Sequence, residues 1–424
     1  MDANFTTVNW AKDATIYEVN IRQYTPEGTF VAFQKHLLRL KEMGVTVLWL
    51  MPITPISDKG KKGNLGSYYA CSSYTKINPE FGTASDFLNL VNAAHALGMK
   101  VIIDWVANHT GRQHEWMELH PDWFSQNEKG EFTERNGWDE VVDLNYQNQA
   151  MRQALIGAMQ YWVRDFKIDG FRCDMAHLVP LDFWIQARKE VETIKPLYWL
   201  AECEEVNYHQ VFDTSYAWAL MHASEKLAKG EAGVHDIYNV LHDYAQYPAG
   251  ANKLLFTSNH DENSWNGTEY EKFGVAAKAW AVFTQTWKGI PLIYSGQELP
   301  NQKRLAFFDK DLIDWQLKDE HAKPALHDFY KTLAELRKTH TAITSGDTFN
   351  LPVDQNGVMS FLRWDKQSTV LVLLNLSTHH HRIQLAHEKL NGNFQNVFSG
   401  LSYSFNNTIP FELMPGEFFV YVKN

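Results

Sequence analysis

The chain has 424 residues, of which 45% are hydrophobic and 21% are charged, so a large folded core is expected and disorder is not. The formal net charge of -11 argues against nucleic acid or an anionic membrane as the main partner. The three cysteines, Cys71, Cys173 and Cys203, are too few for a disulfide framework, and we expect them to be buried and reduced.

No apolar run is long enough to span a membrane, and residues 1–12 lack the basic and apolar regions of a signal peptide. We therefore expect a cytoplasmic monomer with no membrane or nucleic-acid partner. A mature periplasmic or secreted form, from which a signal peptide has been removed, would have the same sequence pattern and stays open.

Strand-like and helix-like segments alternate along the first three quarters of the chain. The predicted strands, in chain order, cover residues 14–19, 45–50, 100–106, 170–174, 197–202, 210–215, 253–259 and 290–295. The predicted helices cover residues 30–43, 83–98, 150–166, 181–194, 272–288 and 325–339. Eight strands that alternate with helices predict an α/β fold with a parallel sheet, long enough to close into a (β/α)₈ TIM barrel.

Two regions depart from this pattern. A polar, Trp-rich stretch at 108–142 follows the third strand, and so long a connection is typical of a small inserted domain. After residue 341, short strands at 357–364, 369–375, 381–385 and 418–422 follow one another without helices, which predicts an antiparallel β-sandwich. The expected domains are a catalytic barrel (1–340), the inserted domain (108–142) and the C-terminal sandwich (341–424).

The stretch from Gly170 to Asp174 carries charges inside an otherwise apolar strand. Because side chains alternate along a strand, Arg172 and Asp174 share one face and must point into a pocket. We expect Arg172 to lower the pKa of Asp174 and keep it ionised. The pair is either a structural ion pair or a positioned nucleophile with its partner.

Other polar and charged residues also fall at the carboxyl ends of predicted strands, where TIM barrels carry their catalytic groups. They are Asp104, Asn108 and His109 after the third strand, His177 after the fourth, Glu202, Glu204 and Glu205 at the fifth, Asn259, His260 and Asp261 at the seventh, and Tyr68 and Tyr69 in the loop after the second. Since the carboxylates gather at one rim, a carboxylate active site is favoured over four separate ion pairs.

The segments Asp104-Trp105-Val106-Ala107-Asn108-His109, Gly170-Phe171-Arg172-Cys173-Asp174, Ala201-Glu202 and Asn259-His260-Asp261 resemble, in order, the four short motifs of the α-amylase family (glycoside hydrolase family thirteen). Val142-Asp143-Leu144-Asn145 resembles its fifth motif, residues 289–298 its strand-eight motif, and residues 411–422 the end of its C-terminal domain. This resemblance covers nearly the whole chain. It implies a retaining glycosidase that cleaves α-1,4-glucosidic bonds of malto-oligosaccharides or starch.

The resemblance implies a role for each matching residue. Asp174 would be the nucleophile, Glu202 the general acid/base and Asp261 the third carboxylate, which orients the sugar hydroxyls. The substrate-binding residues would be Tyr69, Asp104, His109, Arg172, His177 and His260, with Tyr69, paired with Tyr74, stacked under the ring at the cleavage site. From the residues alone, Glu204 and Glu205 are expected to raise the pKa of Glu202.

No cofactor is expected for the chemistry, but the resemblance implies a structural calcium site. Asn108 and Asp143 match two of its side-chain ligands, and hard oxygen ligands suit Ca²⁺. The alternative is that both residues only cap loops, and Asn145, where the best-known α-amylases carry Asp, favours that alternative.

Two other functions stay open beside the hydrolase. One is an exo-acting α-glucosidase, or a transglycosylase or isomerase, with the same three carboxylates, and the other is a non-catalytic carbohydrate-binding relative. Cleavage at internal bonds or at an end depends on whether the loop 52–82 and the insertion 108–142 close the cleft, and their modest lengths favour an open one. The aromatic residues expected to stack glucose rings near the rim are Tyr69, Trp105, Trp116, Trp138 and Trp265.

Overall fold

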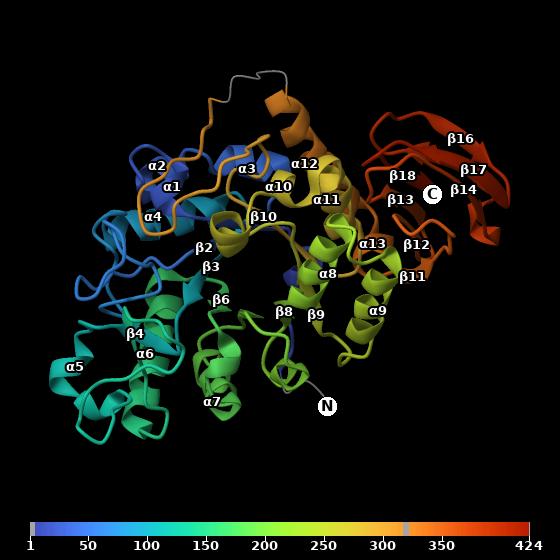
Figure 1. Ribbon diagram of the computed structural model, residues 1–424. Helices are drawn as coiled ribbons and strands as arrows, with labels where there is room; N and C mark the ends of the chain where they lie inside the picture. The colour runs from blue at the N-terminus through green and yellow to red at the C-terminus, as the bar shows by residue number, and fades with distance from the viewer. Residues whose placement is uncertain (1–4, 317–321, 424) are drawn as a thin grey trace.

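The computed structural model describes residues 5–316 and 322–423, and it confirms a closed parallel barrel followed by an antiparallel domain (Figure 1). The outer ends of the first and last predicted domains, and the first four residues of the segment 1–12, lie outside the described residues. No helix in the described ranges is both long enough and apolar enough to cross a membrane.

The barrel closes because β1 pairs in parallel with both β2 and β10. Its strands, in the order in which they neighbour one another, are β1 (Ile16–Val19), β10 (Ile290–Tyr294), β9 (Asn252–Leu255), β8 (Thr214–Tyr216), β7 (Tyr198–Ala201), β6 (Gly170–Cys173), β3 (Lys100–Trp105) and β2 (Val47–Leu50). They are almost entirely buried, as expected of a parallel sheet covered by helices. Gly170 has to be glycine, because a Cβ there would lie 2.1 Å from the carbonyl oxygen of Tyr198.

Helices cover the outside of the barrel. They are α1 (Ile21–Tyr24), α2 (Phe30–Gln34), α3 (Leu37–Met43), α4 (Ala84–Ala96), α6 (Gln149–Phe166), α7 (Leu181–Val191), α8 (Trp218–Ala228), α9 (Val234–Ala245), α10 (Glu269–Phe273), α11 (Ala277–Thr286), α12 (Ala322–Thr339) and α13 (Thr341–Thr344). A capping box opens α4, since Thr83 N–H donates to Asp86 Oδ2 at 2.8 Å and Asp86 N–H donates to Thr83 Oγ1 at 3.2 Å.

Some predicted boundaries were wrong. The helix expected at 30–43 is two helices, α2 and α3. The sixth strand was expected at 210–215, but residues Val206–Gln210 form a 3₁₀ turn and the strand is Thr214–Tyr216. Helices α8 and α9 were not predicted. Strand β9 ends at Leu255, so the polar residues up to Asn259 lie in the loop above the barrel.

The insertion between β3 and α6 is built on a short antiparallel pair, β4 (His109–Gly111) with β5 (Val141–Asp143), and carries α5 (Trp116–Leu119). In Figure 1, α5 and β4 lie on the side of the barrel away from the C-terminal domain. Gly111 allows the insertion to touch the loop after β2, because a Cβ there would lie 2.5 Å from the carbonyl oxygen of Ala70.

The C-terminal domain has two antiparallel layers beside α12 and α13 (Figure 1). One layer has the strand order β11 (Asp347–Asn350), β12 (Val358–Trp364), β13 (Thr369–Asn375), β18 (Phe418–Lys423), β15 (Gly392–Asn396) and β16 (Ser402–Phe405), and the other pairs β14 (His381–Ala386) with β17 (Thr408–Leu413). Leu371 and Leu373 of the first layer share a core with Leu385 and Leu413 of the second, which confirms the predicted sandwich.

Candidate active site

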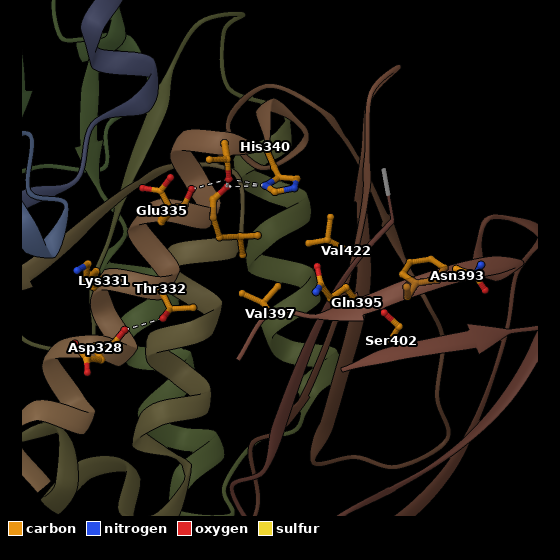
Figure 2. A pocket seen from close by; sticks show the side chains of 13 residues that line it. Asp328, Lys331, Thr332, Glu335, His340, Asn393, Gln395, Val397, Ser402 and Val422 are labelled. Carbon is orange, nitrogen blue, oxygen red and sulfur yellow. Dashed lines mark hydrogen bonds between the residues drawn. The ribbon is translucent and has the colours of Figure 1, made fainter. Parts of the chain in front are cut away.

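Apart from a cavity of about 410 Å³ between the end of α8 and the C-terminal domain, two cavities of the described structure have volumes of about 400 Å³ or more. One, of about 860 Å³, lies between α12 and the C-terminal sheet (Figure 2). On the helix side of this cavity, the hydroxyl of Thr332 is already bonded within α12, because Thr332 Oγ1 donates to the carbonyl of Asp328 at 2.8 Å. The other, of about 400 Å³, lies at the carboxyl ends of the barrel strands and is lined by Asp174, Glu202 and Asp261. The convergence of three carboxylates makes the second cavity the candidate active site.

The register of the barrel strands places these carboxylates side by side. Arg172 lies opposite Asp104 on β3, and Cys173 lies opposite Ala201 on β7. One residue further along the chain, Asp174 follows Cys173 of β6 and Glu202 follows Ala201 of β7. Hydrogen bonds continue one step beyond the strands, because Glu202 N–H donates to the carbonyl of Cys173 at 3.0 Å. Both carboxylates are thus fixed by the backbone of the barrel.

Arg172 is fully buried and holds the acidic side chains together. Its Nη1 donates to Asp104 Oδ1 and to Asp174 Oδ1, both at 2.9 Å, and its Nη2 lies 2.8 Å from Glu202 Oε2. Its Nε donates to Tyr216 Oη at 3.1 Å, and the guanidinium lies 5.0 Å from the ring centroid of Trp49. A single cation therefore faces three carboxylates in a water-poor site.

One positive charge cannot offset the burial of three carboxylates, and their pKa values show this. Burial raises the pKa of Asp174 to about 6, although Arg172 opposes the rise. Burial raises the pKa of Glu202 to about 7, with the nearby charges of Asp174 and Asp261 adding to the rise. Arg172 lowers the pKa of Asp174 as expected, but desolvation by burial outweighs the ion pair, so the net shift is upward.

The predicted cause of the shift at Glu202 was wrong. Glu204 turns away from the cavity: its Oε1 accepts from Tyr244 Oη at 2.5 Å and lies 3.6 Å from Lys253 Nζ. Glu205 caps the backbone N–H of Glu204 at 3.1 Å. The carboxylates that act on Glu202 are instead those in the cavity itself.

Met175 makes a sharp turn directly after Asp174. It has a left-handed backbone, with φ of 40°, which is uncommon for a residue with a side chain. The turn aims its N–H at Glu202 Oε2, at 3.0 Å. Strained backbone is often retained at functional sites, and here it joins the two residues expected to do the chemistry.

His260 lies between the third carboxylate and the floor of the cavity. Its Nε2 is 3.2 Å from Asp261 Oδ2 and 2.8 Å from Tyr69 Oη, and its Nδ1 is 2.5 Å from Glu18 Oε1 on β1. Burial lowers the pKa of His260, but Asp261 and Glu18 outweigh it and hold this pKa well above its usual value. Of these partners, Glu18 was not predicted to belong to the site. A charged residue inside an apolar strand, the pattern that indicated Arg172, is also present at Glu18 in β1.

The remaining predicted residues divide into two groups. Tyr69 lines the cavity, bonds Asp104 Oδ2 at 3.1 Å and stacks on His260, and His109 lines the cavity beside it. Burial lowers the pKa of His109 to about 4, so it is neutral at pH 7. His177 is exposed on the turn after β6 and is not among the residues that line the described cavity.

The aromatic wall differs from the predicted one. Trp138 and Trp265 line the cavity as expected, together with Phe307 and Phe308, which no sequence pattern indicated. Trp105 and Trp116 do not line it. Trp105 follows Asp104 on β3 and therefore points outward, against Phe171, while Trp116 packs on Trp123 within the insertion.

The two predicted calcium ligands are engaged by an arginine. Arg135 Nη2 donates to Asn108 Oδ1 at 2.9 Å, and Arg135 Nε lies 3.2 Å from Asp143 Oδ2. Within the described ranges, no group of three or more His, Cys, Asp or Glu side chains is arranged to hold a metal ion. Because a guanidinium contacts both side chains, the donor set does not fit a calcium ion.

Comparison with known proteins gives consistent matches. The family described as the alpha amylase catalytic domain matches residues 12–323. The solved structure of a noncanonic maltogenic alpha-amylase, AmyB from Thermotoga neapolitana, is 31% identical, with a TM-score of 0.89 over 97% of this chain and 98% of that one. An alpha-amylase from Lactobacillus plantarum is 28% identical, with a TM-score of 0.88 over 98% and 99% of the two chains.

A curated relative, Alpha-amylase MalA of Haloarcula japonica, is 26% identical over 393 residues. The match covers 87% of this chain and 56% of the relative, so the chain spans little more than half of that protein's length.

Proposed function

The chain belongs to the α-amylase family, and on that premise we propose that it hydrolyses α-1,4-glucosidic bonds of malto-oligosaccharides with retention of anomeric configuration. The observation that carries the proposal is the sharing of Arg172 by Asp174 and Glu202, whose pKa values are about 6 and about 7. Near neutral pH the first is mostly ionised and the second is partly protonated, which is the division that a retaining glycosidase requires.

In this proposal Asp174 attacks the anomeric carbon, and Glu202 gives its proton to the glycosidic oxygen as that bond breaks. The result is a glycosyl ester on Asp174 and a free sugar hydroxyl on the leaving chain. Glu202, now ionised, takes a proton from water, and the water oxygen attacks the anomeric carbon and releases Asp174. Atoms and charges return to their starting state, so no cofactor is needed for the chemistry.

Asp261, Tyr69, His109 and His260 are proposed to bind the hydroxyls and the face of the sugar at the cleavage point. Their placement around one cavity supports this role. The imidazolium of His260 and the carboxylate of Asp261 offer one charged donor and one charged acceptor, and charge-assisted hydrogen bonds are the stronger kind. His177 stays a proposed contact on the leaving-group side, because it is exposed on the adjoining turn.

The substrate class rests on the aromatic side chains. Trp138, Trp265, Phe307 and Phe308 line the cavity, and Trp265 is 53% exposed, so it offers a free face to a sugar ring. Several relatives are named for maltodextrin-type substrates, among them a Cyclomaltodextrinase from Bacillus sp that is 26% identical over 431 residues. These observations support short α-glucans as the substrate.

The test is the turnover of maltoheptaose by the wild-type protein and by Asp174→Asn and Glu202→Gln. Both variants should lose about a thousandfold or more in kcat. Asp165→Asn is the matched control, because Asp165 is an exposed carboxylate that pairs only with its neighbour Arg164 in the described structure, and it should keep wild-type turnover. Full activity in Asp174→Asn would overturn the proposal, and longer products in place of hydrolysis would assign a transglycosylase instead.

A second candidate, cleavage from a chain end, is favoured by one observation about the loops. The loop after β2 and the insertion were expected to leave the cleft open. Instead, Lys62 Nζ lies 2.7 Å from Glu140 Oε2, and both residues line the cavity. The same loop bonds the segment after β10, because Leu65 N–H donates to the carbonyl of Phe308 at 3.1 Å. Three segments thus meet along one side of the cavity, which supports an exo-acting enzyme.

Location and assembly remain proposals. Cys71, Cys173 and Cys203 are all buried and unpaired, which supports the expectation of a reducing compartment such as the cytoplasm. We keep the expectation of a monomer, which size-exclusion chromatography coupled to light scattering would test.

A further inference from the structure

We propose that the guanidinium of Arg135 takes the place of a structural calcium ion and makes the stability of this protein independent of divalent cations. Three oxygen atoms converge on it. Arg135 Nη2 donates to Asn108 Oδ1 at 2.9 Å and to the carbonyl of Leu178 at 3.1 Å, and Arg135 Nε lies 3.2 Å from Asp143 Oδ2.

The three oxygens come from distant parts of the chain. Asn108 follows β3, Asp143 ends β5, and Leu178 lies four residues after Asp174. Asn108 and Asp143 are nearly inaccessible, with exposed fractions of 0% and 2%. A buried carboxylate and a buried amide oxygen need a partner, and a single planar cation with several donors meets all three acceptors at once. Arg135 therefore fastens the insertion to the rim that carries the proposed nucleophile.

A calcium ion would find too few ligands here. Ca²⁺ takes six to eight oxygens, usually with several carboxylates, whereas this cluster has one carboxylate. Nearby oxygens are bonded elsewhere: the carboxylate of Glu134 accepts from the N–H groups of Asn136 and Gly137, at 2.7 Å and 3.1 Å, and Asn145 Oδ1 accepts from Gln147 N–H at 3.1 Å. The single positive charge of Arg135 balances the single negative charge of Asp143. A divalent ion in the place of Arg135 would leave the cluster with a net positive charge.

The arrangement also fixes a residue of the cavity. Asn108 Nδ2 lies 3.1 Å from His109 Nδ1, while Asn108 Oδ1 is held by Arg135. Arg135 thus acts on His109 through Asn108, as a positioning residue. Its loss should raise KM for maltoheptaose more than it lowers kcat, because it touches neither Asp174 nor Glu202 in the described contacts.

The test is thermal unfolding of the wild-type protein and of Arg135→Ala, Arg135→Lys and Arg164→Ala, each with EDTA and with millimolar calcium chloride. Arg164 is the matched control, because it is an arginine whose described ion pair, with Asp165, is exposed. The wild-type melting temperature should change by less than about 1 °C between EDTA and calcium. Arg135→Ala should melt about 2–4 °C below the wild type, Arg135→Lys should recover part of that loss, and Arg164→Ala should match the wild type.

Two results would overturn the proposal. The first is a wild-type melting temperature that falls in EDTA and returns with calcium, which would show that a metal contributes to stability after all. The second is an Arg135→Ala protein that melts with the Arg164→Ala control. The wild-type measurement stands even where Arg135→Ala fails to fold, and both readouts are independent of the proposed hydrolysis.

Discussion

Glu18 and His260 are 242 residues apart in the chain, and Glu18 Oε1 lies 2.5 Å from His260 Nδ1 at the floor of the cavity. The barrel creates this contact, since β1 pairs with β10 and β10 pairs with β9, which leads to His260. Glu18 is 0% exposed, and its carboxylate interacts more strongly with His260 than with the cation Arg172. The second ring nitrogen then faces Asp261 and Tyr69 as a donor.

Glu18→Gln should weaken substrate binding by lowering the pKa of His260. Asp261, which raises this pKa more than Glu18 does, would remain beside the ring, so the pKa should fall and the imidazolium should be lost at a lower pH than in the wild type. The loss of the imidazolium should lower kcat/KM by about tenfold or more above pH 7. The measurement is ¹⁵N NMR of the ring nitrogens across pH 6–8, with the exposed Glu412→Gln as control; an unchanged titration in Glu18→Gln would refute this role.

The pH dependence of kcat/KM should be bell-shaped, with a maximum between about 6 and about 7. Activity requires ionised Asp174, so it rises through the pKa of about 6, and it requires protonated Glu202, so it falls through the pKa of about 7. Initial rates on maltotriose give the profile. A maltosyl fluoride has a leaving group that needs no proton, so it can be used to test Glu202→Gln. With this substrate, the pH profile of Glu202→Gln should keep its acid limb and lose its alkaline limb. An alkaline limb that persists would show that a group other than Glu202 causes it.

Glu202→Gln should also stabilise the protein at alkaline pH. Burial raises the pKa of Glu202 in the folded protein, so the folded state binds more protons than the unfolded state between the unfolded value of about 4.3 and about 7. Stability is therefore lost as pH rises through this window. Because Gln carries no charge, Glu202→Gln should raise the free energy of unfolding by on the order of 1–3 kcal/mol at pH 8 and leave it unchanged at pH 4. Differential scanning calorimetry at both pH values measures it, and a lower melting temperature at pH 8 would contradict it.

The Lys62–Glu140 pair should control the position of cleavage. Because it joins two loops along the cavity, Lys62→Ala should open that side and increase release of internal fragments from an end-capped maltoheptaose, about twofold or more, while cleavage of short substrates changes little. Lys61→Ala is the control, since Lys61 forms an exposed pair with Asp58. If the wild-type protein already releases internal fragments from the capped chain as fast as from the free one, the loops do not block the cleft.

The parts of the fold that could be predicted from sequence are those with strong local signals. Continuous apolar runs predicted β2, β3 and β10, and the helix expected at 83–98 is α4. The short strand β8 and the helices α8 and α9 were misplaced or missed, because the polar stretch around residue 210 has no clear period and tertiary packing decides its structure. The C-terminal strands β15, β16 and β17 were missed for a similar reason, as their exposed faces break the apolar pattern.

The candidate site shows a similar division. Arg172, Asp174, Glu202 and Asp261 were predictable, because a charge at the end of a buried strand requires a partner or a pocket and the family motifs carry these residues. Phe307, Phe308 and Arg135 were not, because they lie on loops whose position depends on contacts with distant segments. Ser264 Oγ, for example, donates to the carbonyl of Leu305 at 2.7 Å and brings the Phe307 segment beside Asp261. The net upward shift of the pKa of Asp174 was not predicted, because the degree of burial cannot be judged from sequence.

The most direct test of the central claim is mass spectrometry of the protein after reaction with a fluorinated maltosyl fluoride, which forms the glycosyl intermediate quickly and releases it slowly. After digestion, we expect one modified peptide, with the maltosyl group on Asp174 and none on the same peptide from Asp174→Asn. A maltosyl group on another residue, or no covalent adduct while the wild-type protein still turns the reagent over to the inverted anomer, would contradict the proposed mechanism.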